Sequence, residues 1–164
     1  SADGGPMNDL DVAALLSSAV EQLRTADVAD EALAELKPAR RIGPITKPMR
    51  LVPAGRAWRL GEVLLDADAR LYSTGSVTRA LTPKDFAANK SQAEEDRREL
   101  QRAAVRGRFR TGEAVNFGYA RLAIGDERLP IIDGTPLLRL QQAEVPLETY
   151  LADRIRFAIN PGWD

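Results

Sequence analysis

The spacing of apolar residues along the chain predicts an amphipathic helix near each end. In residues 10–23, apolar side chains recur every three or four positions, which places them on one stripe of a helix. The same spacing recurs in residues 147–159, directly after Pro146. A weaker stripe predicts a further helix over residues 28–37. The two runs before Pro38 are therefore expected to form an N-terminal helical arm, residues 8–37.

Runs of β-favouring residues predict strands in the middle of the chain. An almost continuous apolar run from Trp58 to Leu65 and an alternating run from Leu71 to Val77 are joined at Asp66–Ala69. Short acidic side chains favour a turn there, because they hydrogen-bond to nearby backbone groups. Further strands are expected over residues 113–122 and on both sides of Asp133-Gly134, a dipeptide typical of tight hairpins.

Another helix is predicted over residues 91–106. Ser91 and Glu94 have the spacing of a capping box, and Gly107 is placed to end the helix. These elements predict an α+β fold: a mostly antiparallel meander sheet of four to five strands, covered by two helices, 91–106 and 147–159, with the N-terminal helical arm attached.

Composition shifts suggest where the chain divides. Residues 1–7 are interpreted as a tag or disordered start, ahead of the helical arm. Prolines interrupt residues 38–55, which are expected to form an extended basic connector. The remaining residues, 56–164, are predicted to form the α+β domain.

The residue types that are missing limit the chemistry available. The 164-residue chain has no cysteine and no histidine, which excludes a thiolate nucleophile, a Ser-His-Asp triad and a histidine base within this chain. We predict no catalytic residue, no cofactor and no metal ligand. No apolar run is long enough to cross a membrane and no leader is evident, so a cytoplasmic location and no membrane partner are expected. The excess of arginine and alanine is typical of a GC-rich bacterial genome.

Charge is segregated strongly along the chain. Residues 1–36 contain eight acidic residues against one arginine, a net charge of −7, whereas residues 37–59 contain seven basic residues and no acidic one. One interpretation is that the two segments lie together and offset each other. The other is that the basic segment binds an anion such as RNA or DNA. The pI of 5.6 argues against nucleic acid, because nucleic-acid-binding domains commonly have a pI above about 9.

A second basic row is predicted on the helix 91–106. Arg98, Arg102 and Arg106 follow one another at four-residue intervals, so they share one helix face and could follow phosphates. The simpler interpretation is a solvated helix whose arginines pair with its own glutamates. The candidate anion-binding residues from both basic segments are Arg40, Arg41, Arg98, Arg102 and Arg106.

Three functional hypotheses follow from the sequence. The first is a non-catalytic module that binds another protein or self-associates through the N-terminal helix. The second is an anion or nucleic-acid binder that uses the arginines, which is the less favoured alternative. The third is an enzyme or small-ligand pocket on the sheet, although its members could equally be ordinary exposed strand residues. The candidate pocket residues are Glu62, Tyr72, Arg79, Asn116 and Tyr119.

Overall fold

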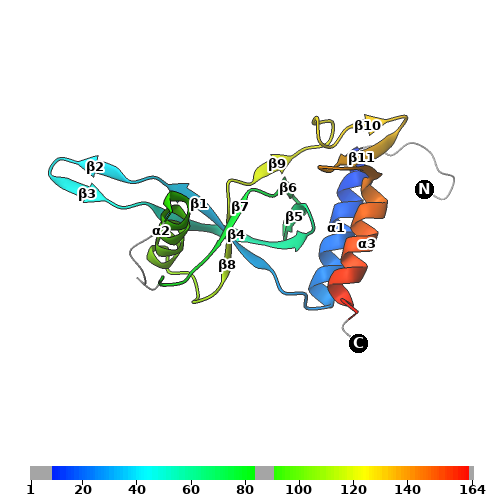
Figure 1. Cartoon of the computed structure of the whole chain (residues 1–164). Coiled ribbons are helices and arrows are strands. Elements are labelled where there is room, and N and C mark those ends of the chain that lie inside the picture. Colours follow the sequence, from blue (N-terminus) through cyan, green and yellow to red (C-terminus); the bar gives the residue numbers. More distant parts are fainter. Residues whose placement is uncertain (1–8, 84–90, 163–164) are drawn as a thin grey trace. The chain divides into compact units, whose positions relative to one another are not determined.

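The computed structural model describes residues 9–83 and 91–162 (Figure 1). The predicted start segment, residues 1–7, lies outside the described residues. In chain order the described elements are α1 (Asp9–Thr25), β1 (Glu31–Lys37), β2 (Arg40–Ile42), β3 (Ile45–Lys47), β4 (Arg50–Leu60), β5 (Val63–Asp66), β6 (Leu71–Ser73), β7 (Ser76–Arg79), α2 (Gln92–Arg106), β8 (Ala114–Phe117), β9 (Ala120–Leu122), β10 (Ile131–Ile132), β11 (Thr135–Arg139), β12 (Glu144–Pro146) and α3 (Leu147–Ile159).

The chain divides into two compact units. The helix-pair unit comprises Ser1–Asp30, Trp58–Ser73 and Ala120–Asp164. The ribbon unit comprises Glu31–Ala57 and Thr74–Tyr119. The helix-pair unit therefore contains α1 and α3, whereas the ribbon unit contains α2 and the β2–β3 pair.

The predicted four- to five-stranded antiparallel meander is wrong. The described residues form a seven-stranded mixed sheet in the order β7-β8-β1-β4-β5-β6-β9, a three-stranded sheet β10-β11-β12 and a two-stranded sheet β2-β3. Neighbours in the large sheet are often distant in sequence. In particular, β1 pairs with β8 in parallel, with Ala32 opposite Val115, and with β4 in antiparallel orientation.

The helix predicted over residues 28–37 is also wrong, because most of this segment is β1. Its alanine, leucine, glutamate and lysine residues favour helices when considered alone. In the structure Ala32, Leu33 and Ala34 are all buried, and β1 lies between β4 and β8. Pairing on both edges satisfies the backbone of this segment, so tertiary contacts override its helix propensity.

The central strands have different bounds from those predicted. Trp58–Leu65 is not one strand: β4 ends at Leu60 and β5 begins at Val63, with Gly61 at a φ of 68° between them. The predicted turn at Asp66–Ala69 is confirmed, and the Ala69 N–H donates to the Asp66 carbonyl oxygen at 3.1 Å.

Two further predicted strands are interrupted. Leu71–Val77 is divided between β6 and β7, which belong to different units. Residues 113–122 are divided at Gly118, where φ is 70°. Residues 38–55, predicted as an extended basic connector, contain β2, β3 and the start of β4.

The three helices predicted around residues 10–23, 91–106 and 147–159 are confirmed as α1, α2 and α3. The Ser91 Oγ accepts the backbone N–H of Glu94 at 3.1 Å, as a capping residue should. The Asp133-Gly134 hairpin is confirmed as well, and both residues have the positive φ of a tight primed turn.

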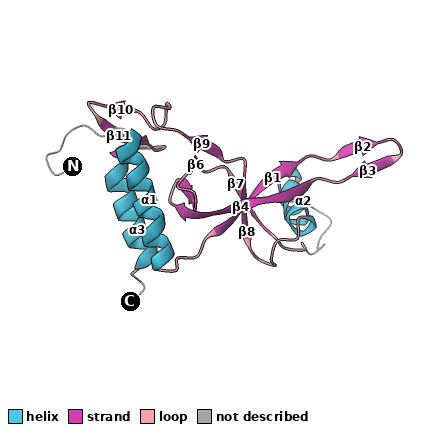
Figure 2. Ribbon diagram, turned by 180° about the vertical axis from the view of Figure 1, so that it is seen from behind, coloured by secondary structure: helices cyan, strands magenta, loops and turns pink. Residues whose placement is uncertain are grey.

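Each unit has its own apolar core. In the helix-pair unit the α1 stripe, including Val12 and Leu23, packs with the α3 stripe, including Leu151 and Ile155. Figure 2 shows these two helices side by side. The Trp58 indole N–H donates to the Val28 carbonyl oxygen at 2.8 Å, which fixes the residues that follow α1.

In the ribbon unit, α2 packs through small residues. Ala103 and Ala104 are fully buried against a cluster that includes Leu51, Val115 and Phe117. In residues 9–83 and 91–162, no helix combines the length and apolar character needed to cross a membrane.

Candidate functional site

The strongest candidate site is the β2–β3 pair of the ribbon unit, residues 40–47, called the basic ribbon below. Figure 1 shows it extending past α2, and Figure 2 shows the same from behind. Gly43 and Pro44 make its two-residue turn, and Gly43 has a φ of 59°. Glycine suits this position because a positive φ has little steric cost without a Cβ atom. Every residue of the basic ribbon is exposed to solvent.

The strand register places like charges opposite one another. Arg40 is paired with Lys47, and Ile42 with Ile45. Because residues two apart in a strand share a face, the cation pair and the isoleucine pair lie on one face of the basic ribbon. Arg41, paired with Thr46, lies on the other.

Two cations also lie opposite each other at the base of the basic ribbon. There β1 pairs with β4 so that Lys37 is opposite Arg50. Only Lys37 of these two has a nearby acid: its Nζ lies 2.9 Å from the Glu35 Oε1. Two successive cross-strand pairs of cations therefore occur within a short length of chain.

Four of these cations have no acidic partner in the described part of the chain. Arg40, Arg41, Lys47 and Arg50 are exposed and form no ion pair with residues 9–83 or 91–162. Like charges directly opposite each other destabilise a strand pair. The basic ribbon thus concentrates positive charge that the described residues leave unbalanced.

The arginines of the row on α2, unlike the cations of the basic ribbon, have acidic partners, because each lies near glutamates of its own helix. Arg98 Nη2 is 3.5 Å from Glu94 Oε1, and Arg102 Nη1 is 3.3 Å from both Glu95 Oε1 and Glu99 Oε2. These pairings place both arginines beside glutamates of α2, and the side chains of Arg98 and Arg102 are only 16% and 29% exposed.

Arg106 connects α2 to the start of β4. Its Nη1 donates to Glu99 Oε1 at 2.8 Å and to the Met49 carbonyl oxygen at 2.6 Å. Hydrogen bonds from Arg106 hold the pKa of Glu99 below its ordinary value. The structure therefore places Arg40 and Arg41 on the basic ribbon, apart from the three paired arginines of α2.

The five candidate pocket residues are divided between the two units. Glu62 and Tyr72 belong to the helix-pair unit, and Arg79, Asn116 and Tyr119 to the ribbon unit. Glu62 Oε1 accepts the Gln141 N–H at 3.2 Å. None of the five lines the three surface hollows described below.

The pocket candidates in the ribbon unit have structural partners. The Asn116 side chain is fully buried, and its Nδ2 donates to Glu31 Oε1 at 3.0 Å and to the Ala32 carbonyl oxygen at 3.1 Å. Arg79 Nη1 donates to the Gly112 carbonyl oxygen at 2.9 Å. Burial raises the pKa of Tyr119, with a smaller contribution from the negative charge of Glu35.

Tyr72 is part of a carboxylate-centred turn. Asp66, which is 6% exposed, accepts the backbone N–H groups of Asp68 and Arg70 at its Oδ1. Its Oδ2 accepts Arg70 Nε at 3.0 Å and the Tyr72 hydroxyl at 2.9 Å. Burial and this hydrogen bond raise the pKa of Tyr72. These contacts explain why the buried carboxylate stabilises the β5–β6 turn.

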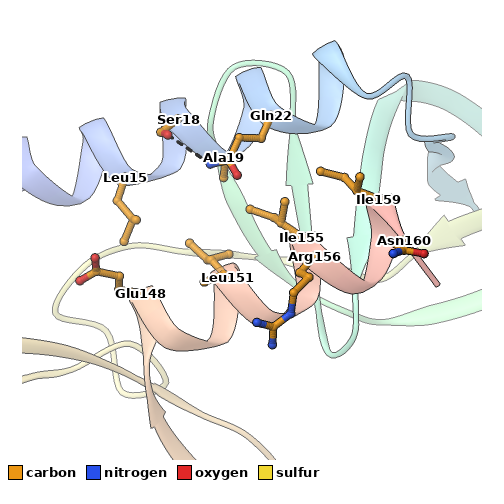
Figure 3. A pocket seen from close by; sticks show the side chains of 11 residues that line it. Leu15, Ser18, Ala19, Gln22, Glu148, Leu151, Ile155, Arg156, Ile159 and Asn160 are labelled. Atoms are coloured by element: carbon orange, nitrogen blue, oxygen red, sulfur yellow. Dashed lines mark hydrogen bonds between the residues drawn. The ribbon is translucent and has the colours of Figure 1, made fainter. Parts of the chain in front are cut away.

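Surface hollows occur in both units. In the helix-pair unit, an open groove of about 490 Å³ lies between α1 and α3. Figure 3 shows Leu15, Leu151 and Ile155 lining it, with Glu148 and Arg156 among the polar residues drawn. A second hollow, about 340 Å³, lies beside Tyr150 and Phe157. These surfaces are largely apolar and can receive an apolar side chain.

The ribbon unit has its own hollow, of about 540 Å³, where the base of the basic ribbon meets α2. Pro38, Pro48, Met49 and Leu100 supply apolar surface there. Among the described residues, no group of three or more acidic side chains is placed to hold a metal ion.

The sequence prediction of an anion site missed Lys47, Arg50 and the isoleucine pair. The available signal was the Gly43-Pro44 dipeptide, which favours a turn between two short runs. No protein-family model, curated protein or solved structure matches the chain. A function for the basic ribbon is therefore inferred from its charge, exposure and register.

Proposed function

We propose that this protein binds nucleic acid through the basic ribbon and Arg50 at its base, with Arg40, Arg41, Lys47 and Arg50 contacting backbone phosphates. One observation carries this proposal: Arg40 and Lys47 are exposed and face each other across the strands, and neither has an acidic partner in the described residues. A phosphate backbone supplies the closely spaced negative charges that such a ribbon lacks.

The energetics of the basic ribbon support a binding role. An opposite-charge pair across two strands contributes roughly 0.2–1 kcal/mol, whereas facing like charges are unfavourable. Replacing Lys47 by an acidic residue would therefore improve the isolated ribbon. Keeping two cations opposite each other is favourable only when an anion lies between or beside them.

The net charge of −1 is compatible with this function, because the positive charge is local. The seven cations of residues 37–59 occur without an intervening acidic residue. Four unpaired cations support only a moderate affinity, within the range of roughly 10⁻⁴–10⁻⁶ M that is typical of non-specific binding.

The test is fluorescence anisotropy with a labelled duplex DNA in 50 mM salt. The double variant R40Q/K47Q should weaken binding by roughly 60-fold or more, since two phosphate contacts are lost. The matched control R24Q/R97Q removes two exposed arginines that pair with acids on their own helices. Equal affinities for both variants, or no binding by the wild-type protein, would refute the proposal.

Binding of another protein, or self-association, is the second candidate. The apolar stripe of α1 is buried against α3, so α1 does not offer the free apolar face that the sequence hypothesis used. Phe157 on α3 is 58% exposed beside the hollow that it lines. Sedimentation velocity of the wild-type protein and F157S tests this candidate: only a concentration-dependent association that F157S removes would support it.

A further inference from the structure

We infer that the isoleucine pair at the tip of the basic ribbon is a wedge that inserts into the minor groove of duplex DNA and bends it. This inference rests on the proposed function and adds the class of nucleic acid and the mode of binding. Its basis is the placement of Ile42 and Ile45 relative to the cations.

Two large apolar side chains are exposed at the tip. Ile42 is 47% exposed and Ile45 is 62% exposed, and neither belongs to the apolar cores of the described residues. They are directly opposite each other, so their side chains form one continuous apolar surface. Between them, Gly43 and Pro44 add no charge.

The cations are placed to hold phosphates on both sides of this wedge. Arg40 and Lys47 lie on the same face as the isoleucines, two residues behind them. This is about 7 Å along each strand, within reach of long Arg and Lys side chains. The basic ribbon thus has an apolar tip and, two residues back on each strand, one cation. This arrangement complements a groove whose floor is formed by bases and whose two walls carry phosphates.

The residue types favour a duplex over a single strand. Proteins that bind single strands use aromatic side chains as stacking platforms, and residues 38–49 contain no aromatic residue. Proteins that bend DNA from the minor groove insert apolar side chains such as isoleucine between base steps. Isoleucine is branched at Cβ, so little conformational freedom is lost on insertion.

The choice of DNA over RNA follows from groove geometry. Inserting a wedge requires a groove that can open as base pairs unstack, and pyrimidine–purine steps of DNA deform in this way. Double-stranded RNA is recognised mainly by shape and by its 2′-hydroxyl groups, which the two isoleucines cannot contact by hydrogen bonding. The tip therefore fits DNA with flexible TA steps.

The experiment measures bending separately from binding. A 30-base-pair DNA duplex with a central TA step carries a donor and an acceptor dye at its ends. The wild-type protein should raise energy transfer at saturation, and 2-aminopurine at the TA step should brighten as it unstacks. The variant I42A/I45A keeps every cation, so it should bind within about tenfold of the wild type and lose both signals.

Several outcomes would overturn the inference. If the wild-type protein binds DNA without a change in energy transfer, the wedge is wrong while the proposed function stands. Tighter binding to a single-stranded RNA, a double-stranded RNA or an acidic peptide than to the DNA duplex would also overturn it. Unchanged bending by I42A/I45A, with circular dichroism showing a folded protein, would exclude these two residues as the wedge.

Discussion

Replacing Lys47 by glutamate should raise the stability of the protein slightly while it weakens nucleic-acid binding. In the wild-type protein Lys47 faces Arg40 across the basic ribbon, and neither has an acidic partner in the described residues. Glutamate at this position turns a repulsive pair into an attractive one. Opposite charges at such positions contribute about 0.2–1 kcal/mol, so the free energy of unfolding should stay the same or rise by up to about that amount.

The effect on binding can be worked out from counterion release. Each phosphate contact contributes a slope of about 0.9 to the dependence of the binding constant on salt, which is roughly an eightfold change in affinity at 0.1 M salt. Lys47→Gln removes one contact and should weaken binding by about eightfold. Lys47→Glu also adds a negative charge that repels phosphate. If this charge weakens binding as much as the loss of one further phosphate contact, the affinity should fall by about 60-fold.

Two measurements test this prediction together. Fluorescence anisotropy gives the affinity of each variant for a duplex DNA, and urea denaturation gives its free energy of unfolding. An affinity of Lys47→Glu within twofold of the wild type would refute the role of the basic ribbon. A loss of binding accompanied by a loss of more than about 1 kcal/mol of stability would instead indicate that Lys47 supports the fold.

Three further predictions concern residues that stabilise the fold of one unit or the other. Asp66→Ala removes the acceptor of four hydrogen bonds and should lower the free energy of unfolding by about 2–3 kcal/mol. In Asp66→Ala the pKa of Tyr72 should fall towards its ordinary value. Ultraviolet titration measures this pKa, with Tyr72→Phe as the control that identifies the Tyr72 signal. An unchanged pKa would contradict the described network. Gly107→Ala should cost about 1–3 kcal/mol, because the new Cβ would overlap the carbonyl oxygen of Leu51; urea denaturation showing no loss would contradict this close approach. Burial raises the pKa of Glu113, but hydrogen bonds from Arg56 and Arg110 outweigh it, so the net pKa is lowered. The stabilisation by Glu113 is therefore complete above a pH of about 4.5 and is lost as the pH falls through the lowered pKa. Glu113→Gln should be less stable than the wild type at pH 7, with a difference that shrinks below about pH 4.5; a difference that is independent of pH would refute the assignment.

Local signals in the sequence were sufficient for the three helices. Ser91 and Glu94 define the start of α2, and Pro146 precedes α3, so each boundary depends on residues that are close in the chain. The turns at Asp66–Ala69 and Asp133-Gly134 were predictable for the same reason. Their side chains and backbone angles are determined by immediate neighbours.

The sheet could not be predicted in this way, because its pairings join distant segments. Ala32 in β1 pairs with Val115 in β8, 83 positions further along. Nothing in the composition of β1 indicates this partner, and its residues individually favour a helix. The meander expectation failed since it joined only strands that are consecutive in sequence.

The candidate site shows the same division between local and distant information. The basic character of residues 37–59 was evident from composition, but the exposure of the cations and their cross-strand pairing depend on the register of β2 and β3. The arginine row on α2 was evident too. Its pairing with Glu94, Glu95 and Glu99 depends on side-chain positions, which the spacing of the arginines does not determine.

The most direct test of the central claim is the salt dependence of the affinity of the wild-type protein for duplex DNA. Four cations without acidic partners in the described residues, Arg40, Arg41, Lys47 and Arg50, predict a straight line of log binding constant against log salt concentration, with a slope of about −3 to −4. A slope near zero, or no binding in 50 mM salt, would contradict the claim that the basic ribbon binds nucleic acid.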